Sequence, residues 1–290
     1  MTIVVAGEAL FDLVLHADGS VGAHPGGGPF NAARTIGRLG TPAAFLGRIS
    51  RDRFGRRLAG ELEADGVTLG EALRTDAPTT VAVAELSAEG AATYRFYTEG
   101  TAAAGLTPDV ALATLPGSTE ALMVGTLGLV VEPLATAVEA LVGHVDVPVL
   151  LDANVRPAAI RDEAAYRARL TRLLARTDVL KASDDDLAWI APGTDPVEAA
   201  RALGAPTTLL TRGAGGAAVV TTETEVEIPA PRVEVVDTIG AGDAFAGAFL
   251  VARRDGADIP GAAGFAARVA AVTCTRAGAD PPTRAELGGD

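Results

Sequence analysis

The sequence predicts an α/β protein whose main sheet is mostly parallel and covered by helices on both faces. Short apolar runs typical of buried strands alternate with segments in which apolar residues recur every three or four positions. Strands that alternate with helices are joined by crossover connections, which produce parallel sheets with helices on both sides. Two further segments alternate in polarity and predict a small additional β-sheet.

The expected strands of the main sheet are short, apolar and separated by helical patterns. Phe54, Leu58 and Leu62 recur at four-residue spacing, as do Leu134 and Val138, which places apolar side chains along one face of a helix. The strands are expected at residues 2–6, 43–49, 121–125, 147–152, 178–180 and 207–211.

Residues 10–24 and 79–97 each read as a β-hairpin. Their turns are expected at Asp18-Gly19 and Glu89-Gly90. We expect the apolar side of these strands to cover the ligand end of the main sheet, or to pair with a second copy in a homodimer. No repeat or linker divides the chain, so residues 1–290 are expected to form a single domain.

Composition excludes several functional classes. The net charge of −13 and the lack of a basic run argue against a nucleic-acid partner. Cys274 is the only cysteine, so no intrachain disulfide can form, as expected for a cytoplasmic protein. The apolar stretch 121–131 is shorter than the roughly 20 residues that span a bilayer, and residues 1–10 read as a first strand, not a signal peptide. We expect no membrane association.

The segment 235–250, VVDTIGAGDAFAGAFL, carries the chemistry. We expect a β-like stretch, then a tight turn, then a helix from about Asp243. Gly240 and Gly242 let the backbone approach a ligand closely, and the free N–H groups of a first helical turn attract phosphate. A carboxylate at Asp243 beside a phosphate makes sense if it removes a proton from an attacking hydroxyl.

A simpler interpretation is that Asp243 is only the N-cap of the helix. Two common nucleotide-binding motifs do not apply. The chain has no G-x-x-x-x-G-K-[ST], and Phe245 occupies the last glycine position of G-x-G-x-x-G. The residues alone leave both interpretations open.

The string D-T-I-G-A-G-D resembles the C-terminal signature of the ribokinase, or PfkB, family of carbohydrate kinases. A second signature, residues 26–31 (GGGPFN), opens a helix that runs to about residue 40. Other matching motifs occur in the family's order: Gly7, Glu8 and Asp12 in G-E-x-x-x-D, Asp152 and Asn154 in D-x-N, Thr211, Gly213 and Gly216 in T-x-G-x-x-G, and the closing loop 275–279.

This resemblance implies a ribokinase-like three-layer sandwich with a β-sheet lid, and an ATP-dependent kinase that uses Mg²⁺. Asp243 would be the catalytic base, and Gly240, Ala241 and Gly242 would form the anion hole with it. The residues implied in sugar binding are Asp12, Gly27, Gly28, Asn31, Asn154 and Arg156.

On the nucleotide side, the resemblance implies roles for Thr211, Gly213 and Gly216, and for the segment 266–279 at the adenine. Lys181, Ser183 and Asp186 lie where the family often carries N-x-x-E. The shorter Asp186 could act through metal-bound water, or the acidic run could simply begin a helix. The monovalent-cation loops of many relatives correspond to Asp237, Ile239 and Gly278, so K⁺ is a further candidate ligand.

The string 154–157, NVRP, resembles the fructokinase-like branch and also 2-keto-3-deoxygluconate kinases. Arg156 could meet a substrate carboxylate, brace a phosphate or form a surface ion pair. We expect fructose, because an acidic sugar would favour more cations and only Arg95 adds one to the sugar-binding segments. The acidic sugar, ribose or a nucleoside are the alternatives. A non-catalytic sugar-binding protein would not need the complete G-A-G-D with Asp243.

Overall fold

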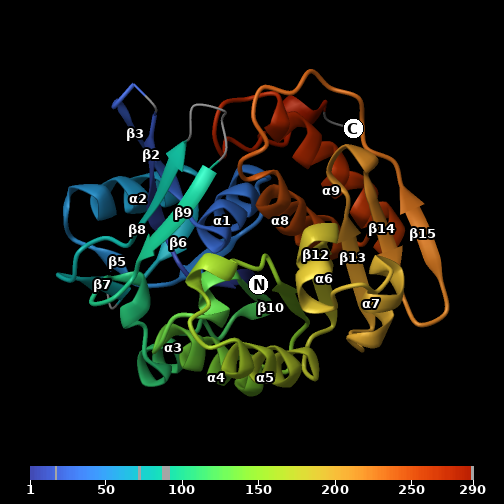
Figure 1. Ribbon diagram of the computed structural model, residues 1–290, viewed down its shortest axis with the longest axis horizontal. Helices are drawn as coiled ribbons and strands as arrows, with labels where there is room; N and C mark the ends of the chain where they lie inside the picture. Colours follow the sequence, from blue (N-terminus) through green and yellow to red (C-terminus); the bar gives the residue numbers. More distant parts are fainter. Residues whose placement is uncertain (17, 71–72, 87–91, 289–290) are drawn as a thin grey trace.

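A central sheet organises the computed structural model, which describes residues 1–16, 18–70, 73–86 and 92–288 (Figure 1). Within these ranges the sheet has nine strands, in the order β15 (Glu225–Ile228), β14 (Ala217–Val220), β13 (Thr207–Thr211), β12 (Val179–Ser183), β11 (Val149–Asp152), β10 (Thr119–Gly125), β1 (Thr2–Ala6), β4 (Ala43–Leu46) and β6 (Val67–Leu69). Neighbours from β13 to β6 are parallel, and β14 and β15 are antiparallel. The predicted mostly parallel sheet is confirmed.

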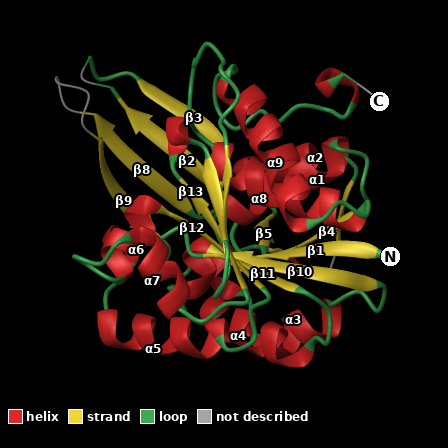
Figure 2. Cartoon of the chain, turned by 90° about the vertical axis from the view of Figure 1, so that its right-hand side faces the viewer, coloured by secondary structure: helices red, strands yellow, loops and turns green. Residues whose placement is uncertain are grey.

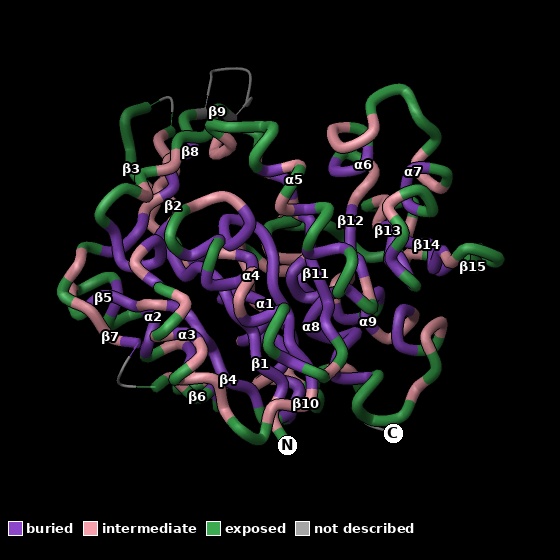
Figure 3. Tube along the Cα trace, turned by 90° about the horizontal axis from the view of Figure 1, so that it is seen from below, coloured by how far each residue is buried: buried purple, intermediate pink, exposed green. Residues whose placement is uncertain are grey.

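Helices cover both faces of this sheet, as Figure 2 shows. One face carries α1 (Gly28–Arg38), α2 (Arg53–Ala64), α8 (Ala241–Arg254) and α9 (Ile259–Cys274); the other carries α3 (Pro108–Thr114), α4 (Leu134–His144), α5 (Glu163–Leu174), α6 (Asp184–Ile190) and α7 (Pro196–Ala202). Strand residues alternate between the two faces. Ile3 and Val5 therefore pack in the core beneath α1 and α8, while Val4 and Ala6 pack in the opposite core. The strands at the centre run through the buried interior (Figure 3).

A second sheet, the lid sheet, has the order β3 (Val21–Gly26), β2 (Leu10–Leu15), β8 (Val81–Leu86) and β9 (Ala92–Tyr97). The two predicted hairpins are present, and they join through a parallel β2–β8 pair. Leu10 and Ala82 pack with Leu127 of the core. The turn at Asp18-Gly19 forms, with the Gly19 amide donating to the His16 carbonyl at 2.9 Å. The predicted turn at Glu89-Gly90 lies outside the described residues.

Several predicted boundaries are wrong. The strand expected at 43–49 ends at Leu46, and β5 (Ile49–Ser50) pairs separately with β7 (Arg74–Thr75). Residues 235–239 form no strand, and the side chains of Val235 and Val236 lie largely in solvent. The edge strands β6 and β15, and β14 next to β15, were not predicted from the apolar pattern.

The last correction concerns the start of α8, which begins at Ala241, two residues before the expected position. Gly240 is its N-cap, with φ 76°, in the left-handed region that glycine adopts without strain.

Helices α1 and α8 pack unusually closely at Gly247. A Cβ atom at that position would lie 2.7 Å from the carbonyl oxygen of Ala32 and 3.2 Å from Cβ of Thr35. Only glycine therefore lets the two backbones approach to this distance. This contact brings together the two segments that carry the family signatures.

No helix within the described ranges combines the length and apolar character needed to cross a membrane.

Candidate active site

The candidate site lies where the carboxyl ends of β1, β10 and β11 meet the first turns of α1 and α8. This edge is the usual ligand-binding end of a parallel sheet. Asp243 lies in the first turn of α8 and is 9 % exposed. Nδ2 of Asn31, on α1, donates a hydrogen bond of 2.8 Å to Oδ2 of Asp243. The structure thus joins the predicted base to a predicted sugar-binding residue.

Asp243 is not the N-cap of α8, because Gly240 holds that position and no side chain caps the helix. Asp243 is the third helical residue, and its carboxylate faces Asn31 instead of the free N–H groups of its own helix. The simpler interpretation of Asp243 as a cap is wrong. The carboxylate is held in place by a neighbouring helix, as a proton acceptor of fixed direction would require.

The predicted anion hole forms a tight turn at Gly240 that no other residue could make. A Cβ atom at Gly240 would lie 2.5 Å from Cβ of Ala279. The Ala241 amide donates to the Thr238 carbonyl at 3.3 Å, so it is partly engaged. The amides of Gly242 and Asp243 follow in the first turn, where helical N–H groups have no partner within the helix. These two amides are the donors best placed for a phosphate oxygen.

Gly28 lies at the centre of the predicted sugar side. A Cβ atom there would lie 2.6 Å from Oγ1 of Thr126, 3.2 Å from Oδ1 of Asp243 and 3.3 Å from Nδ2 of Asn154. Three polar side chains from different elements therefore converge on one small cradle. A side chain at position 28 would fill it, which supports the predicted role of Gly28.

Thr126 is a member of this cradle that sequence reasoning missed. Both Thr126 and Asn154 have positive φ angles, 54° and 32°, which are rare outside glycine and are typical of strained functional sites. Asn154 Nδ2 donates to Thr126 Oγ1 at 3.1 Å. The only signal in the sequence is position, because Thr126 directly follows the strand β10 at its carboxyl end.

Asp12 lies on β2 of the lid sheet, and its carboxyl group is close enough to Asp243 and Arg156 to be affected by both charges. A Cβ atom at Gly26 would lie 2.0 Å from Oδ2 of Asp12, so the carboxylate passes directly over that glycine. Gly27 has a φ angle of 107°. A Cβ atom at Gly27 would lie 2.7 Å from the carbonyl oxygen of Glu8. Burial, reinforced by the charge of Asp243 and opposed by Arg156, raises the pKa of Asp12 to about 6.

Arg156 is the cation of the predicted sugar side. Its Nη1 donates to the carbonyls of Asn154 and Val155 at 3.2 Å each. No carboxylate of the described residues forms an ion pair with it, so the surface-ion-pair alternative is wrong. Its charge lowers the pKa values of both Asp12 and Glu8, which places the guanidinium beside this acidic cluster.

Lys181 and Asp152 form a buried ion pair beneath α8. The Nζ atom of Lys181 lies 3.0 Å from Oδ1 of Asp152, with both side chains almost fully buried. A Cβ atom at Gly242 would lie 3.0 Å from the same Nζ atom. Burial lowers the pKa of Lys181, but the carboxylates of Asp152, Asp186 and Asp243 outweigh burial and raise it, so the ammonium stays charged. Its positive charge lies directly behind the predicted anion hole.

Ser183 and Asp186 form a capping box at the start of α6. The Asp186 carboxylate accepts from the Ser183 amide and hydroxyl at 2.8 Å each, and from the Val155 amide at 2.7 Å. All of these contacts are structural. They favour the helix-start interpretation, and they brace the loop that carries Asn154; contact with the nucleotide remains a prediction.

The remaining predicted nucleotide residues lie one strand further along the same edge. Thr211 ends β13 opposite Ser183, and Gly213 and Gly216 follow with φ angles of 52° and 89°. A Cβ atom at Gly216 would lie 2.3 Å from the Ile228 carbonyl of β15, so this glycine is required by packing. The segment 266–279 comprises the end of α9 and the following loop.

The two predicted cation loops lie side by side. The carboxylate of Asp237 accepts from the Gly278 amide at 2.8 Å and from the Ile239 amide at 3.0 Å. One side chain therefore ties the loop before α8 to the loop after α9, next to Gly240.

Comparison with known sequences decides the family. The profile of the family described as pfkB family carbohydrate kinase matches residues 2–286. The chain belongs to the pfkB family of carbohydrate kinases.

Relatives with and without solved structures agree with this assignment. A fructokinase of Rhizobium leguminosarum bv. trifolii is 39 % identical over 253 residues, covering 84 % of this chain and 77 % of the relative. The crystal structure of Xylella fastidiosa fructokinase with bound ATP superposes with a TM-score of 0.89 at 26 % identity, covering 99 % and 96 % of the two chains. A Vibrio cholerae O395 fructokinase double mutant, in a form with fructose, ADP and potassium bound, gives a TM-score of 0.86 at 26 % identity, again over 99 % and 96 %. The expected fold of this pfkB kinase is confirmed.

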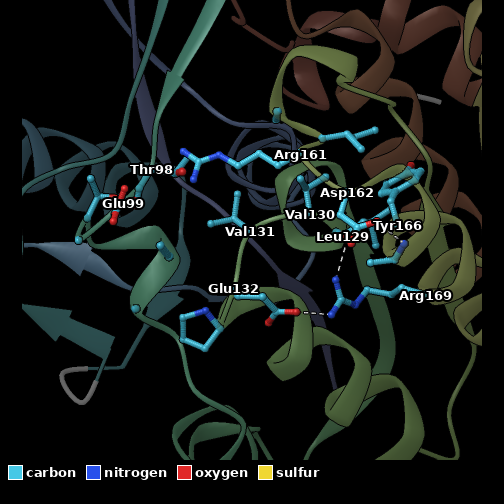
Figure 4. A pocket seen from close by; sticks show the side chains of 18 of the residues that line it. Thr98, Glu99, Leu129, Val130, Val131, Glu132, Arg161, Asp162, Tyr166 and Arg169 are labelled. Atoms are coloured by element: carbon cyan, nitrogen blue, oxygen red, sulfur yellow. Dashed lines mark hydrogen bonds and ion pairs between the residues drawn. The ribbon is translucent and has the colours of Figure 1, made fainter.

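The pfkB kinase also has a separate cavity of about 630 Å³ between the segment 98–105 that follows β9, residues 129–133 and the start of α5 (Figure 4). Glu132 and Arg169, which line it, pair with each other, and Arg169 also donates to the Leu129 carbonyl at 3.4 Å. None of the predicted site residues lines this cavity. It is therefore distinct from the cradle at Gly28.

Proposed function

We propose that this pfkB kinase transfers the γ-phosphoryl group of ATP to a primary hydroxyl of fructose. The observation that carries the proposal is Asp243, which lies in the first turn of α8 between the sugar cradle at Gly28 and the amides of the anion hole. This position, between the sites expected for the hydroxyl and the phosphate, supports Asp243 as the proton acceptor.

The proposed chemistry needs one proton acceptor and several donors. The oxygen of the sugar hydroxyl attacks the γ-phosphorus while Asp243 takes the proton of that hydroxyl. The bond between the γ-phosphorus and the departing ADP oxygen breaks. The amides of Gly242 and Asp243 donate to the phosphoryl oxygens as negative charge develops on them. Lys181, charged and buried behind Gly242, favours anions at the same place.

Fructose is preferred to an acidic sugar because of the charges around Arg156. Asp12 and Asp243 face the same space, and Glu8 lies behind it, so a substrate carboxylate would meet carboxyl groups as well as the guanidinium. Arg95, the other cation of the sugar-binding segments, is exposed and forms an ion pair with Glu85 at 3.4 Å on the lid sheet. The names and bound sugar of the relatives agree with a neutral ketohexose.

Two ions are compatible with the residues present. Within the described ranges no group of three or more His, Cys, Asp or Glu side chains is placed to hold a metal, so Mg²⁺ would be held mainly by nucleotide phosphates and water. A K⁺ ion would fit between the loops of Asp237 and Gly278, which one hydrogen bond already joins. Such ions neutralise phosphate charge and stiffen the loop. Equal rates in K⁺ and in a bulky organic cation, at matched ionic strength, would exclude the K⁺ part.

The lid sheet also supports a proposal about assembly. Tyr94 and Tyr97 of β9 are 49 % and 57 % exposed, in a chain that is poor in aromatic residues. We infer that a second copy of the chain covers them in a cytoplasmic homodimer. Light scattering at micromolar concentration tests this, and a monomer with and without sugar would exclude it.

The proposed reaction is tested by a panel of hydroxyl compounds with ATP. Fructose, ribose, a nucleoside and 2-keto-3-deoxygluconate are compared by kcat/KM from coupled ADP release. We expect fructose to be the best substrate and to yield a phosphomonoester at a primary hydroxyl, identified by NMR. A higher kcat/KM for another compound of the panel would identify that compound, and not fructose, as the substrate. Absence of ADP release with every compound would contradict the proposed kinase reaction.

A further inference from the structure

The carboxyl group of Glu8 is buried at the end of the central strand β1, and the chemistry proposed above does not use it. Its exposed fraction is 0 %, and neither carboxyl oxygen has a hydrogen bond of ordinary geometry in the described part of the chain, although the backbone amides of Glu8 and Gly28 lie close enough to lower its pKa. A buried, ionised carboxylate without well-formed hydrogen bonds is very costly, whereas a neutral carboxylic acid costs much less. The structure therefore favours Glu8 in its protonated form.

Two charged groups act on Glu8, one from α8 and one from the loop after β11. Burial is the largest cause that raises its pKa, and the negative charge of Asp243 on α8 adds to it. Arg156, in the loop after β11, lowers the pKa, as do the backbone amides of Glu8 and Gly28, and the result is a pKa of about 8. Asp12 on β2 responds to the same two charges, those of Asp243 and Arg156. Glu8 is thus linked to the base and to the cation of the sugar side.

We propose that Glu8 is a positioning residue that must keep its proton for phosphoryl transfer, so that its ionisation switches the kinase off in alkaline solution. This inference rests on the proposed kinase reaction. With Glu8 neutral, the carboxylates of Asp12 and Asp243 face one guanidinium, that of Arg156. Ionised Glu8 adds another negative charge in a buried site that must admit the ATP polyphosphate, and charges repel strongly where the dielectric is low.

The kinetic test compares wild type with Glu8→Gln, which has the same shape and stays neutral. With sugar saturating, kcat/KM for ATP is measured from pH 6 to pH 9.5. The wild type should lose about tenfold per pH unit above the pKa, the slope expected for loss of one essential proton. Glu8→Gln should keep its neutral-pH value, and the exposed Glu63→Gln should behave as wild type. An unchanged alkaline limb in Glu8→Gln would overturn the proposal.

Direct titration of the Glu8 carboxyl group in the protein without substrate tests this inference independently of which sugar is phosphorylated. Difference infrared spectroscopy of wild type against Glu8→Gln should show the band of a protonated carboxyl at pH 7, lost as the pH passes about 8. Asp243→Asn removes a neighbouring negative charge and should move this loss to lower pH, whereas Arg156→Ala should move it higher. A glutamate remote from both charges would show no such shifts. An ionised Glu8 at pH 7 would refute the proposal even if fructose is phosphorylated, and failure of fructose would leave this titration intact.

Discussion

Nδ2 of Asn31 donates a 2.8 Å hydrogen bond to Oδ2 of Asp243 across 212 residues of sequence. The two side chains belong to the two signature segments, and both are buried. The bond leaves Oδ1 of Asn31 buried and without a partner in the described protein. Asn31 therefore orients the Asp243 carboxylate with one atom, while its other polar atom remains unused.

Asp243→Asn should lower kcat by at least about 100-fold, because the amide cannot accept the proton, a loss typical of general-base removal. Binding of ATP and fructose, measured by calorimetry, should change little. Asp109→Asn is the matched control, since Asp109 is an exposed aspartate in the first turn of α3. A kcat close to that of the wild type in a folded Asp243→Asn protein would show that Asp243 is not the catalytic base.

Asn31→Ala should lower kcat by roughly tenfold, because the carboxylate of Asp243 loses the donor that fixes its direction. Asn31→Asp should be worse, since two carboxylates would then face each other. In the Asp243→Asn background, Asn31→Ala should cost little further kcat, and this non-additivity is the signature of residues that act together. Fully additive losses would show that Asn31 acts on the sugar alone.

Arg156→Ala distinguishes the substrate alternatives. If Arg156 only neutralises the charge of neighbouring carboxyl groups, the variant should have a lower kcat/KM for fructose and for 2-keto-3-deoxygluconate, to a similar extent. If Arg156 reads a substrate carboxylate, the acid should be the better substrate of the wild type and should lose its advantage in the variant, because a charge-assisted bond disappears. The ratio of the two kcat/KM values, in both proteins, decides between these outcomes.

Gly240→Ala should destabilise the protein and abolish the anion hole. The substitution places a side chain at φ 76°, and its Cβ would lie 2.5 Å from Cβ of Ala279. Gly256→Ala is the matched control: φ is 93°, with open space around the added atom. Gly256→Ala should cost about 1 kcal/mol from backbone strain alone. Gly240→Ala should lower the free energy of unfolding, measured by chemical denaturation, clearly more than Gly256→Ala does, and it should also lower kcat. Equal losses of stability in the two variants would contradict the predicted clash with Ala279.

Stability should fall as the pH rises from about 5 to about 8. Glu8 and Asp12 have folded-state pKa values of about 8 and about 6, above their ordinary values, mainly because both are buried. Between the unfolded and folded pKa values the native state binds more protons, so the free energy of unfolding decreases with pH. Relative to wild type, Glu8→Gln should gain on the order of a few kcal/mol by pH 8 and little at pH 4.5. Urea unfolding across this range measures the difference, and a constant difference would contradict it.

Much of the fold followed from local patterns, and the failures have physical reasons. The four-residue spacing of apolar residues was enough to predict the helices α2 and α4, because their buried faces are continuous. The edge strand β15 was missed because Glu225 and Glu227 are exposed and give it little apolar character. The start of α8 was misplaced because the left-handed conformation of Gly240 is a property of the backbone, which the motif does not reveal.

The site was predicted in part for a similar reason. Motifs identified Asn31 and Asp243, but their hydrogen bond depends on the packing of α1 against α8. Thr126 belongs to no motif, and only its position after β10 and its positive φ mark it. Ser183 and Asp186 were given a nucleotide role by resemblance, whereas their side chains form a helix cap. Sequence spacing located the elements of the site and did not determine which atoms meet.

The close contact at Gly247 has a consequence for how the enzyme can move. Because α1 and α8 are in close contact there, we expect the segments of Asp243 and Gly28 to move together. We therefore expect any closing motion on sugar binding to occur in the lid sheet, which carries Asp12 and joins the core through connecting residues such as Gly27. The hinge would thus bring Asp12 to the sugar while Asp243 and Asn31 keep their geometry throughout the catalytic cycle.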